Sequence, residues 1–225
     1  MLHITPTSKG IGVKLWGTYE DLNGFYEVIG KYWGEERNLT MTGSENRDKL
    51  ISSFSYEVRK AFEGQRLKKK SDHPATVGVV YFGCEISWVH FLFFLAALKF
   101  NMRYSETTKF DIAMVLQIEY GLEEAMKVYD PTGARKLAGF IDGGVFEANE
   151  YIYHYMRSIN MDYVMLGGGK KAFRQLPRLL KKGVFFTDEF NAYKTFLEKE
   201  AQKHGCTVND LEIDDDYVDY EGLKW

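Results

Sequence analysis

The chain has 225 residues, of which 29 are basic and 32 acidic, and its formal charge is −3. Hydrophobic residues make up 45% of it, a fraction that excludes a disordered or collagen-like chain. The length allows one ordinary domain, or one domain with an appendage. The cysteines, Cys84 and Cys206, form no CxxC pair, and no signal peptide is expected at the N-terminus, so we expect a cytoplasmic protein without a disulfide framework.

The first 62 residues predict two short strands, at 3–5 and 12–19, followed by two amphipathic helices, at 20–33 and 44–62. Thr18 with Asp21 three residues later has the spacing of a capping box for the first helix. Thr42 and Glu45 offer the same spacing to the second helix. Residues 65–74 are polar and basic, which indicates an exposed loop.

Residues 77–98 form an apolar segment that is long enough to span a bilayer. Its first half is rich in β-branched and aromatic residues, which favours a buried strand at 77–86. A helix at 88–100 follows, and it is apolar on nearly every side. A carboxylate at Glu85 in mid-span would cost about 2.5–3.5 kcal/mol on membrane insertion. We therefore expect a strand and a helix in a soluble core, with no membrane partner.

The second half of the chain predicts mostly helix. We expect helices at 109–129, 146–159 and 187–204, a break at 130–133, and a short strand at 161–166. Pro177 is expected to split the helical pattern that follows the strand, and Thr187 is expected to cap the last helix.

These elements predict a helix-rich α+β fold with a small N-terminal mixed or antiparallel sheet packed on long helices. We expect three parts, namely an α+β domain at 1–130, a mostly helical part at 131–205 that packs on it, and an acidic aromatic tail at 206–225.

The segments Leu2–Thr7 and Gly12–Gly17, together with the stretch Tyr81–Lys99, resemble a family of uncharacterised bacterial proteins of unknown function. The resemblance covers residues 1–130. It implies no catalytic residue, because the family has no established activity.

A glycine-rich turn with lysines is the best candidate for a phosphate site. Its members are Gly167, Gly168, Gly169, Lys170, Lys171 and Arg174. Backbone N–H groups in such a turn, between a strand and a helix, can hold an anion. The spacing of a P-loop is absent, and a flexible connection with exposed lysines is the alternative. The basic residues between 170 and 182, with no acid among them, also allow contact with nucleic acid, although the sequence pI of about 6.0 opposes a dedicated nucleic-acid binder.

The tail carries the opposite charge, with six carboxylates in ten residues: Glu212, Asp214, Asp215, Asp216, Asp219 and Glu221. Without them, 26 acidic residues remain against 29 basic ones, so the rest of the chain is positive. One hypothesis is that the tail docks on residues 170–182 of its own or a neighbouring chain. A frayed acidic terminus is the alternative.

Glu85 and His90 flank the junction between the apolar strand and the apolar helix, where a carboxylate and an imidazole could act as general acid and base. Structural roles for both side chains are the alternative. The five histidines show no spacing typical of a metal site, so neither a metal nor another cofactor is expected.

The absence of a catalytic motif, the many Tyr and Trp residues and the acidic aromatic tail favour a non-enzymatic protein that binds another protein or itself. Toxin-neutralising immunity proteins have this general composition. Phosphate-ligand or nucleic-acid binding through Gly167–Lys182 is the first alternative, and an enzyme that uses Glu85 and His90 is the second.

Overall fold

A small antiparallel sheet begins the fold. The computed structural model describes residues 1–34, 41–71, 77–212, 223 and 225. The strands lie side by side in the order β1-β2-β4-β3, with the bounds β1 (His3–Pro6), β2 (Gly12–Gly17), β3 (Leu67–Lys70) and β4 (Val80–Ser87). All three pairings are antiparallel. The structure confirms a helix-rich α+β fold with a small N-terminal sheet.

The strand β3 corrects one expectation, because part of the exposed loop predicted at 65–74 pairs with β4. Leu67 lies opposite Gly83 and Lys70 opposite Val80. Lysine side chains occupy most of β3 and are exposed, a composition that protects an edge strand from pairing with another chain. The sequence pattern pointed to a loop because a charged edge strand has no buried face to reveal it.

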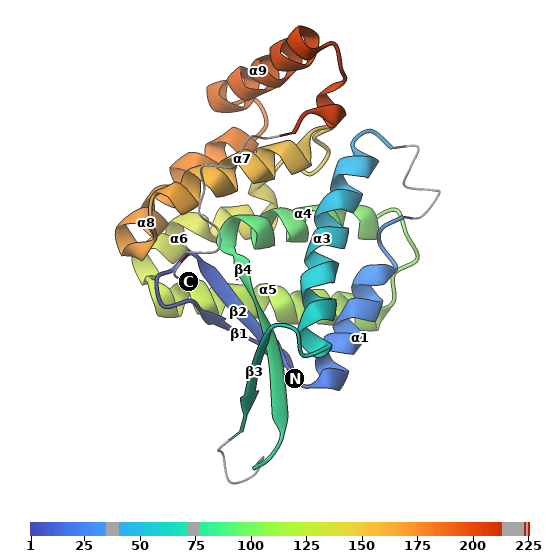
Figure 1. Ribbon diagram of the computed structural model, residues 1–225, viewed down its shortest axis with the longest axis vertical. Coiled ribbons are helices and arrows are strands. Elements are labelled where there is room, and N and C mark those ends of the chain that lie inside the picture. The colour runs from blue at the N-terminus through green and yellow to red at the C-terminus, as the bar shows by residue number, and fades with distance from the viewer. Residues whose placement is uncertain (35–40, 72–76, 213–222, 224) are drawn as a thin grey trace.

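In the described part of the chain, one face of the sheet is covered by the helices α1 (Tyr19–Gly30), α3 (Ser44–Phe62), α4 (Trp88–Met102) and α5 (Lys109–Tyr129) (Figure 1). The alternate residues Val13 and Leu15 of β2, with Cys84 and Ile86 of β4, are buried in one cluster with these helices. Because α4 lies at the centre of this layer, it is buried on nearly every side, as its apolar sequence predicts. None of the described helices is long and apolar enough to cross a membrane.

The two predicted capping boxes have different outcomes. Thr18 and Asp21 form theirs at the start of α1, as expected. The box expected from Thr42 and Glu45 is wrong. The N-cap of α3 is Gly43, which has no side chain that could form a capping hydrogen bond. Gly43 has a φ of 75°, and a Cβ there would lie 2.7 Å from the main-chain oxygen of Asn149. Close packing of two distant segments therefore decides how this helix begins.

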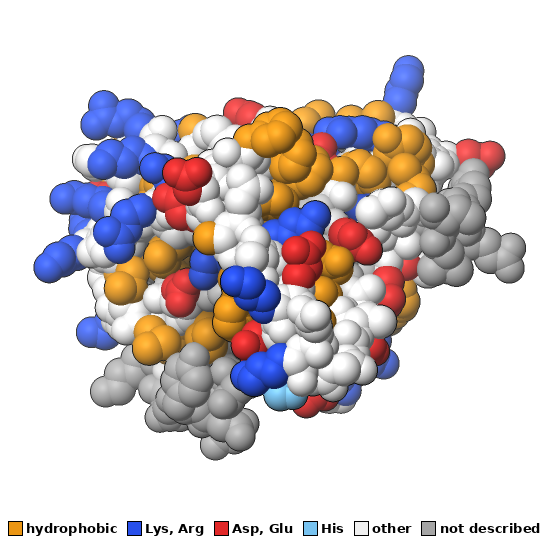
Figure 2. Space-filling model, turned by 90° about the horizontal axis from the view of Figure 1, so that it is seen from above, with side chains coloured by type: hydrophobic (Ala, Val, Ile, Leu, Met, Phe, Trp, Pro, Cys, Tyr) orange, Lys and Arg blue, Asp and Glu red, His pale blue; other side chains and the backbone are white. Residues whose placement is uncertain are grey.

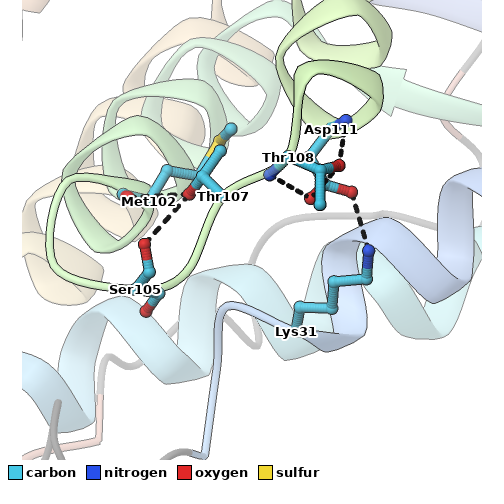
Figure 3. Close-up of polar contacts among 6 residues, drawn as sticks. All are labelled: Lys31, Met102, Ser105, Thr107, Thr108 and Asp111. Carbon is cyan, nitrogen blue, oxygen red and sulfur yellow. Dashed lines mark hydrogen bonds and ion pairs between the residues drawn. The ribbon is translucent and has the colours of Figure 1, made fainter.

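The connection between α4 and α5 is held by polar contacts (Figure 3). Thr108 and Asp111 form a capping box, and the Lys31 Nζ at the end of α1 lies 2.8 Å from the Asp111 carboxylate. Burial alone would raise the pKa of Asp111, but the hydrogen bonds from Lys31 and Thr108 outweigh it and lower the pKa to about 2. This buried carboxylate therefore ties α1 to α5.

The second half of the chain adds further helical elements: α6 (Pro131–Gly139), η2 (Phe140–Gly144), α7 (Ile152–Met165), α8 (Gly169–Leu180), η3 (Lys181–Gly183), α9 (Asp188–His204) and η4 (Val208–Asp210). α6 packs on α5 and α7 on α4, while α8 packs on α6 and α7, and α9 on η3. One hydrophobic cluster runs through both halves, and the Phe173 ring of α8 lies 5.3 Å from the Trp88 ring of α4. Asp130 ends α5 and caps α6, so the predicted break is a junction between two helices. Thr187 caps α9, which ends at His204, as expected.

The strand expected at 161–166 is wrong, and the helix expected at 146–159 begins later than its sequence indicated. Residues 152–165 are one helix, α7, which buries Tyr163 and Val164. A short apolar run of this length cannot be assigned to strand or helix by its periodicity alone.

Pro177 does not split α8, which corrects a further expectation. The helix continues through it from Gly169 to Leu180. A proline inside a helix costs about 3 kcal/mol through the lost hydrogen bond and a steric clash. Burial of Phe173, Leu176 and Leu180 on one face of α8 opposes this cost, since each buried side chain of that size contributes about 1.5–3 kcal/mol.

Candidate functional site

The glycine turn joins α7 to α8, so the strand that the phosphate hypothesis requires before it is absent. Gly167, Gly168 and Gly169 all have positive φ, at 73°, 76° and 86°. The Gly169 N–H donates to the main-chain oxygen of Lys9 at 2.6 Å. A Cβ on Gly168 would lie 2.5 Å from that same oxygen. The turn therefore packs against the β1–β2 connection, and one of its N–H groups is already occupied by a protein acceptor.

Arg174 is bound to a buried carboxylate of the fold. Its Nε and Nη2 donate to the two oxygens of Asp130, both at 2.8 Å, while the Asp130 side chain is only 3% exposed. Asp130 also accepts the Gly133 N–H as the N-cap of α6. The paired Arg174 lowers the pKa of Asp130 to about 2. This ion pair ties α8 to the α5–α6 junction, which gives Arg174 a structural role.

The outer side of α8 carries a dense group of exposed cations. Ala172, Phe173, Leu176 and Leu180 are buried, and the opposite side is cationic. Together with neighbouring positions on α6 and η3, it forms what we call the basic face: Arg135, Lys136, Lys170, Lys171, Arg174, Arg178 and Lys181. All seven side chains are exposed. Among the described residues, Arg174 is the one member of the basic face with an acidic partner.

Figure 2 shows the same feature on the surface. Lys and Arg side chains gather on one side of this view, the side on which α6 and α8 lie in Figure 1. The segments 131–139 and 169–183 contain no acidic residue. α8 has 12 residues, so the cationic stripe along it is about 18 Å long.

Exposed apolar side chains lie at both ends of α8. Met165 and Leu166 precede it and are 63% and 41% exposed, and Phe185 and Phe186 follow η3 at 43% and 80%. Phe186 is the one non-glycine residue of the described chain with a positive φ, 65°. A bulky residue in this region is strained, and such strain clusters at functional surfaces.

Sequence reasoning missed these apolar residues and the two cations of α6. The periodicity of α8 was visible in the sequence, but the strand predicted before it obscured where the helix begins. Arg135 and Lys136 are exposed on α6, and the packing of α6 on α8 is a tertiary contact that the sequence does not display.

The end of the chain reaches the same region. The Ser8 hydroxyl donates a hydrogen bond to the main-chain oxygen of Trp225. The next residue, Lys9, is the one whose main-chain oxygen accepts the hydrogen bond from the Gly169 N–H. The acidic stretch of the tail hypothesis, apart from Glu212, lies outside the described residues. Its docking on residues 170–182 stays a prediction.

Glu85 and His90 contact different partners. Glu85 faces Lys14 across the β2–β4 pairing, with 3.4 Å between the charged atoms. His90 lies in the first turn of α4, and its Nε2 is 3.1 Å from the Ser53 hydroxyl oxygen on α3. Burial lowers the pKa of His90 to about 4, so the imidazole is neutral at pH 7. Each group thus has a structural partner of its own, and the acid–base hypothesis gains no support from their placement.

A cavity of about 670 Å³ lies between α7, α9 and the segment that follows α9. Its lining includes the carboxylates Glu200, Asp210 and Glu212 beside Tyr193 and Phe196. An acidic lining does not suit a phosphate ligand. In the described part of the chain, no three His, Cys, Asp or Glu side chains are grouped to hold a metal ion.

The sequence matches the protein-family model described as "Domain of unknown function (DUF6904)" over residues 2–225. No curated protein and no solved structure matches the chain.

Proposed function

The chain belongs to the DUF6904 family, whose function is unknown, and we propose that it is a non-enzymatic binding protein whose basic face docks an acidic surface of another protein. The observation that carries this proposal is the basic face itself. It presents seven exposed cations, six of which have no acidic partner among the described residues. Charges left unpaired on a surface steer and select a partner of opposite sign.

The apolar residues at the ends of α8 favour a protein as the partner. Protein interfaces combine apolar contacts with Arg and aromatic anchors. Met165 and Leu166 at one end and Phe185 and Phe186 at the other offer such contacts on either side of the cations. A small phosphate ligand would use only a fraction of a stripe about 18 Å long.

The tail of this chain has the chemistry of such a partner. Residues 212–221 carry six carboxylates together with Tyr217 and Tyr220. A peptide with the sequence of residues 212–225 is therefore a suitable probe. The proposal includes a cytoplasmic location, which the two free cysteines support.

Nucleic acid is the second candidate partner. The density of exposed cations favours it, and Phe186, at 80% exposure, offers a ring on which a base can stack. A nucleic-acid complex would bind a single-stranded oligonucleotide more tightly than the acidic peptide, and its affinity would fall steeply with salt.

The experiment compares the two partners by fluorescence anisotropy. A labelled 212–225 peptide and a labelled single-stranded DNA are titrated with the full chain at several salt concentrations. The same titrations are made with D214N/D215N/D216N, in which competition from the chain's own tail is weaker. We expect this variant to bind the peptide more tightly than the unchanged chain.

Charge reversal then locates the site. K171E/R178E changes two exposed cations of the basic face, and K194E/K199E makes the same change of charge on the exposed side of α9. We expect the first to weaken peptide binding about tenfold, which is about 1.4 kcal/mol, and the second to have little effect. Equal losses from both variants, or no binding of the peptide by any form of the chain, would refute the proposal. Tighter binding of the DNA than of the peptide would show that the basic face binds nucleic acid, the second candidate partner.

A further inference from the structure

The outward side of α5 carries an apolar stripe that no part of the described chain covers. Ile112, Leu116 and Tyr120 are spaced four residues apart, so they lie on one side of the helix. They are 46%, 57% and 64% exposed. Val115, Ile118 and Leu122 are buried on the opposite side, where α5 packs on β1 as it crosses the molecule behind the sheet (Figure 1).

Charges of opposite sign lie at the two ends of this stripe. Lys109 is seven residues before Leu116, and Glu123 is seven residues after it. Lys109 is exposed and has no ion-pair partner in the described part of the chain. The Glu123 carboxylate lies 3.6 Å from the Lys127 Nζ, and the Glu123 side chain is 39% exposed. Two whole helical turns separate each charge from Leu116, so all three residues point the same way.

Local helix stability does not account for Lys109. It is the first residue of α5, and the macrodipole at the N-terminus of a helix favours negative charge. A cation at this position is therefore unfavourable for the isolated helix, and a partner outside the chain would compensate for it.

We propose that α5 is a self-association surface and that two copies of this chain pair through it, antiparallel, about a two-fold axis at Leu116. In this arrangement Leu116 meets its own copy, and Ile112 lies level with Tyr120 of the second copy. Lys109 lies about 10 Å along the axis from Leu116, level with Glu123 of the second copy. Two-fold symmetry repeats each contact, so the dimer gains two such ion pairs.

The charge pattern selects a second copy rather than an unrelated protein. The stripe is complementary to itself in the antiparallel direction only. A parallel pairing would place Lys109 against Lys109 and Glu123 against Glu123, which is repulsive. Tyr and aliphatic side chains at the centre with opposite charges at the rim are also the usual anatomy of a protein interface. This surface is independent of the basic face, so the two proposals stand or fall separately.

Sedimentation of the full chain tests the pairing. We expect the weight-average mass to rise from 26.1 kDa toward twice that value as concentration increases. Leu116→Glu places a charge at the centre of the stripe and should hold the chain as a monomer. Phe196→Glu is the matched control, because Phe196 of α9 is also exposed, at 53%, and it should leave the association unchanged.

The charge variants give a stricter test that does not depend on the apolar centre. K109E and E123K each replace two attractive contacts of the dimer by two repulsive ones. Since attraction becomes repulsion at both exposed contacts, we expect each variant to weaken association by about fivefold or more. The double variant K109E/E123K restores opposite charges and should recover the association. A chain that stays monomeric at about 1 mM, or a double variant no better than the single ones, would overturn the proposal.

Discussion

Replacing Arg174 by glutamine separates a structural role of this residue from a role in binding. In the fold, Arg174 gives two hydrogen bonds of 2.8 Å to the buried Asp130. Hydrogen bonds to a charged group contribute about 1.5–3 kcal/mol. Water can partly replace the lost bonds, because Arg174 is 49% exposed, and Asp130 keeps the Gly133 N–H. We therefore expect R174Q to lower the free energy of unfolding by about 1.5–2 kcal/mol.

The assay is thermal unfolding, with R178Q as the control. For a chain of this size, about 1 kcal/mol shifts the midpoint by about 2–4 °C, so R174Q should unfold about 3–8 °C lower. Arg178 is exposed and has no acidic partner among the described residues, so R178Q should unfold within about 2 °C of the unchanged chain. Equal unfolding midpoints for the two variants would refute the structural role of Arg174. Arg174 would then be assigned to partner binding, like the other cations of the basic face.

The pH dependence gives an independent check on the same pair. Arg174 holds the pKa of Asp130 at about 2, below its ordinary value of 3.8. The unfolded chain takes up this proton first as pH falls, so the stabilisation is complete above about pH 4 and is lost toward pH 2. The difference in stability between the unchanged chain and R174Q should therefore narrow as pH falls from 5 to 3. A constant difference would contradict this explanation.

Two further predictions concern buried groups. Burial lowers the pKa of His90 to about 4 from 6.5, so the unfolded chain binds this proton first, and stability should fall as pH decreases from about 6.5 to 4. Unfolding measured across this range should show a smaller pH dependence in His90→Gln, and an unchanged dependence would show that His90 is not the group responsible. Burial raises the pKa of the Cys84 thiol, whereas Cys206 is only partly buried. A thiol reagent should therefore modify Cys206 alone in the native chain and both cysteines after unfolding, and modification of native Cys84 would contradict its burial.

The sequence by itself determined the elements whose signals are local. Amphipathic periodicity predicted α1, α3 and α5, and the side chains of Thr18 and Thr187 cap helices where their spacing indicated. Such signals depend on neighbours within one or two helical turns, which the sequence displays directly. The strand-to-helix change near residue 87 was predicted for the same reason, because composition changes there from β-branched residues to a continuous apolar helix.

Tertiary structure alone decided what the candidate residues contact. The main-chain oxygen of Lys9 accepts the hydrogen bond from the Gly169 N–H. The Asp130 carboxylate accepts one from Arg174, which is 44 positions away along the chain. Packing also decided that Pro177 lies inside a helix, because its cost is opposed by side chains buried against distant elements. The basic face also depends on tertiary packing, because its cations come from α6, α8 and η3, and α8 contacts both of the others in the fold. A sequence specifies which groups can donate, accept or carry charge, but their partners depend on which surfaces the fold buries together.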